Sequence, residues 1–362
     1  MKRLITAVIT ITLVLSMVAC KKEEDKVTVK EPGKTITIID DSAKEETKPV
    51  LSVEKIDRYE KVNISDWFDE NTVLVSKENE SLDKMSLSEL SEHFPMSLYF
   101  LNLTSKEYEL IKEQKEVFLG GAALSMDKKY LLYSEYSLGD PVFYVMNMDT
   151  KEGFGIIGDP IGGANSAKWA DNETVLGASY GGGAYLADRT GNISLIDGLK
   201  EEALFLVEQL GDTIFYNTQY DSTLMKLDLK SNEKVNAGLG QVFNILPSPD
   251  GKQMLVLQSD GAKNTLLIYD NESGEKITIA DGAEIKGVSW SPDQRRIAYN
   301  RMEDKNNTTV SSLYVYDILN GETTQIAVDI DSFHTSWSLS GEKLAYTEYD
   351  GTQYNSSVIY LK

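Results

Sequence analysis

Cysteine and histidine are scarce in this chain of 362 residues. Cys20 is the only cysteine, so no disulfide can form within the chain, and packing alone is expected to hold the fold. The two histidines, His93 and His334, are too few for a three-histidine metal site, and a catalytic triad would depend on one of them. No Asp-x-Asp-x-Asp-Gly calcium loop occurs either. We therefore expect no metal and no cofactor.

Basic residues are also fewer than acidic residues. The chain has 36 Lys and Arg against 57 Asp and Glu, which gives a net charge of −21. Removal of Lys2 and Arg3 with an export signal would change −21 to −23. So acidic a surface repels nucleic-acid phosphates and anionic lipid headgroups. We therefore expect no nucleic-acid partner, and no membrane contact except through an anchor.

The start of the chain has the features of an export signal. Lys2 and Arg3 precede an apolar run of 15 residues, 4–18, which is short for a membrane-spanning helix. The sequence Met-Val-Ala-Cys at 17–20 resembles the bacterial lipobox, in which cysteine becomes the lipidated first residue of the mature protein. The resemblance implies a signal peptide at 1–19 and a lipid anchor on Cys20. An ordinary signal peptide with a cysteine nearby is the alternative.

Lipidation would place the protein outside the cytoplasm. The anchor would hold it on the outer face of the cell membrane, or on the outer membrane if the organism has one. Residues 20–49 are rich in Lys, Glu, Asp, Thr and Pro, which predicts a flexible tether. The segment Thr35–Ile39 alternates as a strand does, but acidic residues separate it from the rest of the chain. The folded domain is expected at 50–362.

All four tryptophans occupy the same place in a recurring unit. Each lies just before a polar turn and an apolar run: Trp67, Trp169, Trp290 and Trp337. Further copies without tryptophan occur at about 124, 209 and 247. From residue 124 onward the copies lie 45, 40, 38, 43 and 47 positions apart, and the first gap is 57. The spacing predicts seven units.

A second marker recurs with the same period. A hairpin strand ends at Asp317, and the same place in other units is taken by Asn102, Asn147, Asp188, Asp228 and Asp270. Four short strands in about 40–45 residues are typical of a β-propeller blade. The Ser-Pro-Asp-Gly turns, as at 248–251, resemble the repeat of TolB-like propellers over about residues 50–362. The resemblance implies a protein-interaction module of the bacterial envelope.

The ends of the predicted domain complement each other. The seventh unit stops at Val358–Lys362 without an outer strand, whereas Val50–Ile56 precedes the first unit at the offset of an outer strand. Pairing of these segments would close the ring and remove its exposed edges. The predicted fold class is therefore all-β, a seven-bladed β-propeller closed by an N-terminal strand.

The first unit carries an insertion at about 77–97. Ser86 and Glu89 match a capping box, and Leu87, Leu90 and Phe94 have helical spacing. The pattern predicts a short amphipathic helix that covers one face of the propeller.

A G-x-S-x-G pattern surrounds Ser179 and looks like the nucleophile elbow of prolyl-oligopeptidase-type hydrolases. An elbow requires a helix after the serine, and Gly181–Gly183 disfavour one. Ser179 instead falls where the second strand of a blade ends. The hydrolases also need a separate α/β domain, for which this chain has no room. We therefore expect no catalytic role for Ser179.

Equivalent positions at the ends of second strands hold four tyrosines: Tyr136, Tyr180, Tyr220 and Tyr349. We call them the rim tyrosines; with Arg301 and Tyr354 they predict a ligand-binding rim around the channel. The alternative is that the rings only pack between blades. The predicted function is a monomeric, non-catalytic module that binds an envelope protein, peptide or glycan. An envelope enzyme that processes glycans or peptides at the propeller face is the alternative.

Overall fold

The computed structural model describes residues 26–31, 34–39, 51–305 and 308–362. Contacts divide the chain into two units, 1–50 and 51–362. In the first unit, β1 (Lys26–Glu31) and β2 (Lys34–Ile39) form an antiparallel hairpin, so the predicted tether contains two short strands. The predicted signal peptide and Cys20 lie outside the described residues. No helix among the described residues is long and apolar enough to cross a membrane.

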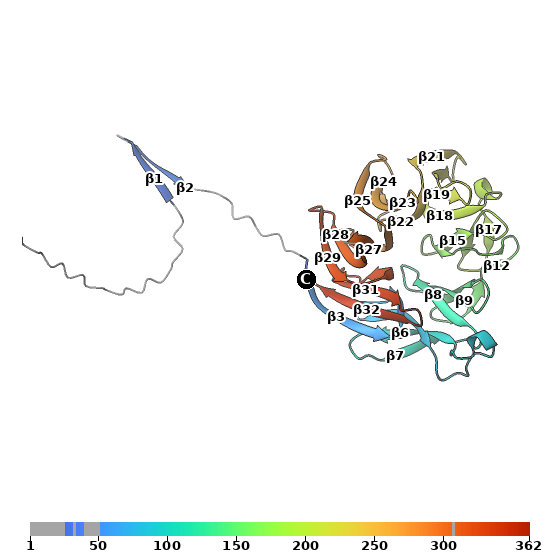
Figure 1. Cartoon of the computed structure of the whole chain (residues 1–362). Coiled ribbons are helices and arrows are strands. Elements are labelled where there is room, and N and C mark those ends of the chain that lie inside the picture. Colours follow the sequence, from blue (N-terminus) through green and yellow to red (C-terminus); the bar gives the residue numbers. More distant parts are fainter. Residues whose placement is uncertain (1–25, 32–33, 40–50, 306–307) are drawn as a thin grey trace, which may run out of the picture. The chain divides into compact units, whose positions relative to one another are not determined.

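The second unit is a ring of four-stranded antiparallel blades (Figure 1). Blade 1 is β4 (Asn63–Trp67), β5 (Thr72–Glu78), β6 (Met96–Asn102) and β7 (Tyr108–Lys112). Blade 2 is β8 (Phe118–Leu124), β9 (Tyr130–Tyr136), β10 (Val142–Asn147) and β11 (Gly153–Gly155). One parallel pair, Met96 with Phe118, joins these two blades. A small sheet, β12 (Ile157–Gly158) and β13 (Gly162–Gly163), comes next in the chain.

The remaining blades repeat the pattern. Blade 3 is β14 (Lys168–Trp169), β15 (Thr174–Ala178), β16 (Ala184–Asp188) and β17 (Ile193–Leu195), followed by the one-turn 3-10 helix η2 (Asp197–Leu199). Blade 4 is β18 (Leu204–Leu210), β19 (Thr213–Thr218), β20 (Leu224–Asp228) and β21 (Lys234–Leu239). Blade 5 is β22 (Val242–Pro247), β23 (Gln253–Ser259), β24 (Asn264–Asp270) and β25 (Lys276–Gly282). Blade 6 is β26 (Glu284–Trp290), β27 (Arg296–Lys305), β28 (Thr308–Asp317) and β29 (Glu322–Val328).

The last blade joins the two ends of the domain. Its strands are β30 (Ser332–Trp337), β31 (Lys343–Tyr349), β32 (Tyr354–Leu361) and β3 (Val53–Glu60). β3 pairs antiparallel with β32, with Ile56 opposite Ile359. Ser52 and Lys362 exchange two backbone hydrogen bonds at 3.1 and 2.9 Å. Closure by an N-terminal strand is therefore confirmed, and the described part of the propeller has seven blades.

The tryptophans recur because each connects neighbouring blades. The indole N–H donates to a carbonyl on the inner strand of the preceding blade in all four cases: Trp67 to Ser336, Trp169 to Ala123, Trp290 to Leu246 and Trp337 to Ser289. The bond from Trp67 is 3.1 Å long and crosses from blade 1 to blade 7. A buried indole N–H needs such an acceptor. The repeat marker is thus an inter-blade hydrogen bond.

The second marker fixes the outer hairpins. In each case a side-chain oxygen accepts one or more backbone N–H groups of the adjoining turn, as Asp188 does from Thr190 at 2.8 Å; the others are Asn102, Asn147, Asp228, Asp270 and Asp317. Asp and Asn close such turns because their short side chains reach the backbone two residues on. Local chemistry therefore explains the periodic Asp and Asn.

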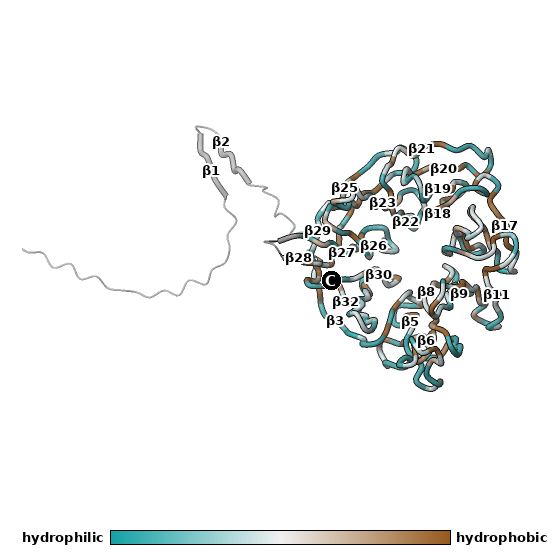
Figure 2. The backbone as a smooth tube through the Cα atoms, turned by 45° about the vertical axis from the view of Figure 1, so that its right-hand side comes forward, coloured by the Kyte–Doolittle hydropathy of each residue, from teal (hydrophilic) through white to brown (hydrophobic). Residues whose placement is uncertain are grey.

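The core lies between the blades. The described residues form seven apolar clusters, and each cluster joins side chains of two adjacent blades. One of them contains Trp67 and Val73 of blade 1 with Ala345 and Val358 of blade 7, so packing also closes the ring. Figure 2 shows the apolar stretches along the strands and the polar stretches at the turns.

The prediction of an amphipathic helix in the first insertion is wrong. The structure has only one 3-10 turn there, η1 (Ser88–Leu90), without a side-chain cap. Ser86 does not cap it, because the Ser86 hydroxyl and N–H both donate to the Glu116 carboxylate, at 2.8 and 2.9 Å. Ser86 therefore bonds to Glu116, in the loop that leads into blade 2, instead of forming the local hydrogen bonds of a capping box.

Candidate binding face

The antiparallel strand order gives the propeller two distinct faces. The turns from second to third strands lie on the same face as the links from one blade to the next. Tyr136 and Tyr349 are the last residues of β9 and β31. Tyr180 and Tyr220 come just after β15 and β19. The predicted placement of the rim tyrosines at strand ends is therefore confirmed, and all four lie on this face, which we call the tyrosine face.

Tyr136 is less exposed than the other three rim tyrosines. Tyr220 is 89% exposed, and Tyr180 and Tyr349 are each 52% exposed. Tyr136 is half-buried. Rings that only packed between blades would be covered, so the packing alternative fits Tyr136 better than the other three.

The tyrosine face also carries apolar side chains that the sequence analysis missed. Phe205 and Phe333 are exposed near the beginnings of the inner strands β18 and β30, and Leu138 is exposed in the β9–β10 turn. Inner strands begin on this face, because the blade-to-blade links end there. In the sequence, a large apolar residue at the start of an inner strand, such as Phe205 or Phe333, is the signal that could have identified these exposed positions.

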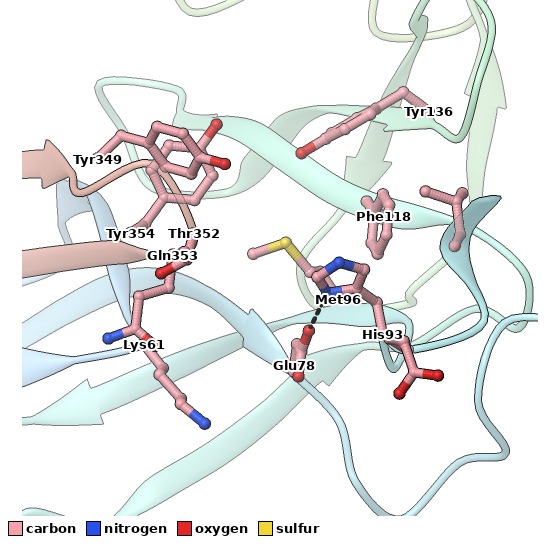
Figure 3. Close-up of a pocket in the computed structure, with 12 residues that line it drawn as sticks. Lys61, Glu78, His93, Met96, Phe118, Tyr136, Tyr349, Thr352, Gln353 and Tyr354 are labelled. Atoms are coloured by element: carbon pink, nitrogen blue, oxygen red, sulfur yellow. Dashed lines mark hydrogen bonds and ion pairs between the residues drawn. The ribbon is translucent and has the colours of Figure 1, made fainter.

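A cleft of about 420 Å³ opens where blades 7, 1 and 2 meet (Figure 3). Tyr349 and Tyr354 lie on one side of it, and Tyr136 and Phe118 lie on the other. Met96, His93, Glu78 and Lys61 also line it. We call it the aromatic cleft. A cavity of this size with a few polar groups is typical of a ligand site.

Contacts within the aromatic cleft fix its walls. The rings of Tyr349 and Tyr354 are 5.0 Å apart between centroids, and those of Phe118 and Tyr136 are 5.6 Å apart. His93 Nδ1 lies 2.9 Å from Glu78 Oε1, and its ring meets Phe118 edge-on. Such offset and edge-to-face pairs are favourable ring geometries. The side chains are therefore held in place by one another.

The phenol of Tyr136 is a hydrogen-bond donor at physiological pH. Burial raises its pKa to about 12, and the phenol of Tyr354 contributes to the shift. A group with that pKa stays protonated far above neutral pH. The cleft therefore offers a neutral hydroxyl on one wall, opposite the two rings of Tyr349 and Tyr354.

The other predicted site residues lie outside the aromatic cleft. Arg301, in β27, pairs with Glu303, and its guanidinium lies 4.7 Å from the centroid of the Tyr314 ring. These contacts hold Arg301 against its own blade. Tyr180 neighbours Asp140; partial burial, and then that carboxylate, raise the pKa of the Tyr180 phenol. Tyr220 does not line the cleft.

A second cleft, of about 530 Å³, lies beside the first and shares Gln353 with it. We call it the acidic cleft, because its lining includes four carboxylates and one arginine: Glu60, Asp329, Glu348, Asp350 and Arg58. Hydrogen bonds from Thr352 lower the pKa of Asp350 to about 2, together with bonds from Gln353 and Asn355. Asp350 is therefore ionised at physiological pH.

The buried titratable groups of the inner strands have protein partners. His334 Nε2 donates to the Ser65 carbonyl at 3.1 Å, and burial lowers the pKa of the imidazole. Burial raises the pKa of Glu208, although the Lys168 ammonium opposes the shift. Both contacts are consistent with a structural role for these groups.

Ser179 lies where the sequence analysis placed it. It comes directly after β15, is buried, and donates its hydroxyl to the Gly182 carbonyl at 2.5 Å. A turn and then strand β16 come after it instead of a helix. Among the residues that the structure describes, no group of three or more His, Cys, Asp and Glu side chains could hold a metal ion.

Comparison with solved structures finds other β-propellers. An oligogalacturonate lyase, solved in complex with manganese, matches with a TM-score of 0.62 and 12% identity over 86% of this chain and 97% of that chain. The β-propeller domain of Cps50 (Swd1) from Myceliophteria thermophila has a TM-score of 0.58 and 10% identity over 86% of this chain and 99% of that chain. TolB from Acinetobacter baumannii has a TM-score of 0.49 and 12% identity over 80% of this chain and 63% of that chain.

These likenesses concern architecture. At 12% and 10% identity, the lyase and Swd1 share the fold with this chain, and a fold alone does not specify an activity. Neither the comparison with protein-family models nor that with curated protein sequences finds a match. The chain is thus an all-β protein of the β-propeller class.

Proposed function

We propose that this protein is a lipid-anchored, extracytoplasmic β-propeller that acts as a non-catalytic binding module in the bacterial cell envelope. The observation that carries the proposal is the set of exposed rings on one face. Tyr220, Tyr180 and Tyr349 each leave more than half of their surface open. Tyrosine supplies rigid, amphipathic contact area at a low entropy cost, which suits recognition of a protein, peptide or glycan.

The aromatic cleft gives the proposed partner an anchor point. Its volume of about 420 Å³ accommodates one or two side chains, and side chains that fill a pocket at the centre of an interface contribute much of the binding energy. The rest of the tyrosine face would then supply the surrounding contacts. Anchoring through Cys20 would keep this surface outside the cytoplasm, at the membrane where envelope partners are concentrated.

Crosslinking in intact cells tests the proposal. The wild type is compared with a variant that carries Tyr220→Ala and Tyr349→Ala, and with a control that carries Met126→Ala and Leu319→Ala on the opposite face. Met126 and Leu319 are 72% and 77% exposed, so the control removes comparable apolar area. We expect one defined adduct in the wild type and the control, and its loss in the tyrosine variant. An adduct that persists in the tyrosine variant would contradict the proposal.

A further inference from the structure

The two clefts of the tyrosine face share Gln353, which lies near Asp350 in the turn between β31 and β32. One is lined by aromatic rings and the other by carboxylates. We infer that they bind a positively charged peptide segment of the partner. One Lys or Arg side chain enters the aromatic cleft and a second enters the acidic cleft. This inference rests on the proposed function and specifies the chemistry of the ligand.

The aromatic cleft has the composition of a cation site. The rings of Tyr349 and Tyr354 face those of Tyr136 and Phe118 across the opening (Figure 3). Ring faces attract a Lys or Arg cation electrostatically, and the attraction increases where water is excluded. The Glu78 carboxylate also lines the cleft, and Figure 3 shows it hydrogen-bonded to His93. An entering cation therefore meets aromatic rings and a carboxylate in the same cleft.

The one lysine of the aromatic cleft does not block it. Figure 3 shows the Lys61 side chain extending away from the four rings. Glu92, which also lines the cleft, adds a second carboxylate. Glu92 is ion-paired with Lys84 at 3.3 Å, and Glu78 lies 2.9 Å from His93. The negative charge that favours a cation thus comes mainly from the adjoining acidic cleft. The local charge therefore favours a cation over an anion.

The acidic cleft provides the second, independent observation. Its four carboxylates outnumber its single arginine. The low pKa of Asp350, about 2, keeps that group charged at any physiological pH. A cleft of this charge gains from a cationic guest, which relieves repulsion between the carboxylates. A ligand with a single cation in the aromatic cleft would make no ion pair with the carboxylates of the acidic cleft. The favoured ligand therefore has at least two basic side chains.

The charge of the whole chain acts in the same direction. A net charge of −21 attracts cationic partners at long range and raises their association rate. Such attraction is screened by salt, with a Debye length of about 8 Å at physiological ionic strength. Binding of the basic segment should therefore weaken as salt is added. An uncharged sugar could stack on the same rings, but its binding would be insensitive to salt.

Isothermal titration calorimetry of the purified full chain tests the inference. The probes are acetylated and amidated peptides in which five Lys alternate with Gly, and matched peptides with norleucine or Glu in place of Lys. We expect the Lys peptide to bind at least about tenfold more tightly than the norleucine peptide, and to lose affinity in about 0.5 M salt. The Glu peptide should not bind.

Two variants and two matched controls assign the binding to the clefts. Tyr349→Ala and Glu348→Gln should each weaken the Lys peptide at least about threefold, because they alter the aromatic and the acidic cleft. Leu319→Ala and Glu152→Gln, in the β28–β29 and β10–β11 turns on the opposite face, should leave binding unchanged. Thermal melting of each variant confirms that it is folded.

Other outcomes would overturn the inference in distinguishable ways. Equal binding of the norleucine peptide would show an apolar site. Binding of N-acetylglucosamine that Tyr349→Ala abolishes, without binding of the Lys peptide, would show a sugar site. In both cases the cationic ligand is rejected while the binding function stands. If none of these probes binds and the cells yield no adduct from the tyrosine face, the proposed function fails as well.

Discussion

Individual residues of the rim differ in what they do for the fold. Tyr136 is half-buried and meets Phe118 at 5.6 Å between ring centroids, whereas Tyr220 is 89% exposed. We expect Tyr136→Ala to lower the free energy of unfolding by about 2 kcal/mol, which is roughly half the cost of removing a fully buried aromatic ring. Tyr220→Ala should cost less than about 0.5 kcal/mol. Urea unfolding of the two variants measures both values, and equal costs would contradict this division of roles.

Asp188 illustrates how a turn residue links stability to pH. Its carboxylate accepts hydrogen bonds from Thr190 and Asn192, which lower its pKa to about 2. A folded-state pKa below the unfolded value of about 3.9 gives stability that is present above that value and is lost as pH falls toward 2. Asp188→Asn should therefore flatten the decline in stability between about pH 4 and pH 2. Denaturant unfolding across this range checks the slope; an unchanged slope would mean that the turn does not contribute.

Residue-level markers were predictable where their role is local or repeated. The tryptophans and the turn Asp and Asn residues make the same contact in each blade that has them, so their period gave the blade count and the topology. The aromatic cleft was not predictable in this way. It combines Tyr349 and Tyr354 with His93 and Phe118, and these come together only because blade 7 closes beside blade 1.

At the scale of elements, the closing strand is the most consequential single segment. β3 covers the edge of β32 and completes blade 7. Deletion of residues 50–56 would remove the half of β3 that pairs with Ile359–Leu361 and leave that part of the β32 edge open, and open edges promote aggregation. Deletion of 24–44 removes β1 and β2, which belong to the other unit. We expect aggregation and a lower Tm in the first deletion and a nearly unchanged Tm in the second; equal damage from both would contradict the assignment.

The insertion of blade 1 shows where a sequence pattern fails. Leu87, Leu90 and Phe94 have helical spacing. A helix cap at Ser86 would need the Ser86 side chain, and a stronger hydrogen-bond partner elsewhere can take that side chain instead. Here the Glu116 carboxylate takes both donors of Ser86. The partner is 30 residues away in sequence, so a local pattern does not contain it. The result is a single turn that brings Leu90, Glu92 and His93 to the aromatic cleft.

At the scale of the whole molecule, the proposed function depends on location. If Cys20 is the lipidated residue, Cys20→Ser should release the protein from membranes, because a lipoprotein's two or three acyl chains would otherwise hold it stably. Fractionation of cells into membrane and soluble parts measures the release. A Lys21→Ser variant is a control that leaves the cysteine in place. Retention of Cys20→Ser in the membrane fraction would reject the anchor.

The two faces of the propeller differ in chemistry, and this difference is the basis of the account. The tyrosine face has the rim tyrosines and the two clefts, whereas the most exposed apolar side chains in the turns of the opposite face are the aliphatic Met126 and Leu319, with the less exposed ring of Phe68. Partner binding through the tyrosine face is therefore the central claim.

Site-specific photo-crosslinking in living cells tests that claim most directly. A photoreactive amino acid is placed at Tyr180 or Tyr220 on the tyrosine face, and at Met126 or Leu319 on the opposite face. All four side chains are at least 52% exposed, so a probe at each position is accessible to a partner. We predict that both positions on the tyrosine face capture the same partner and that neither opposite position does. Capture of that partner mainly from Met126 and Leu319, with none from the tyrosine face, would contradict the account.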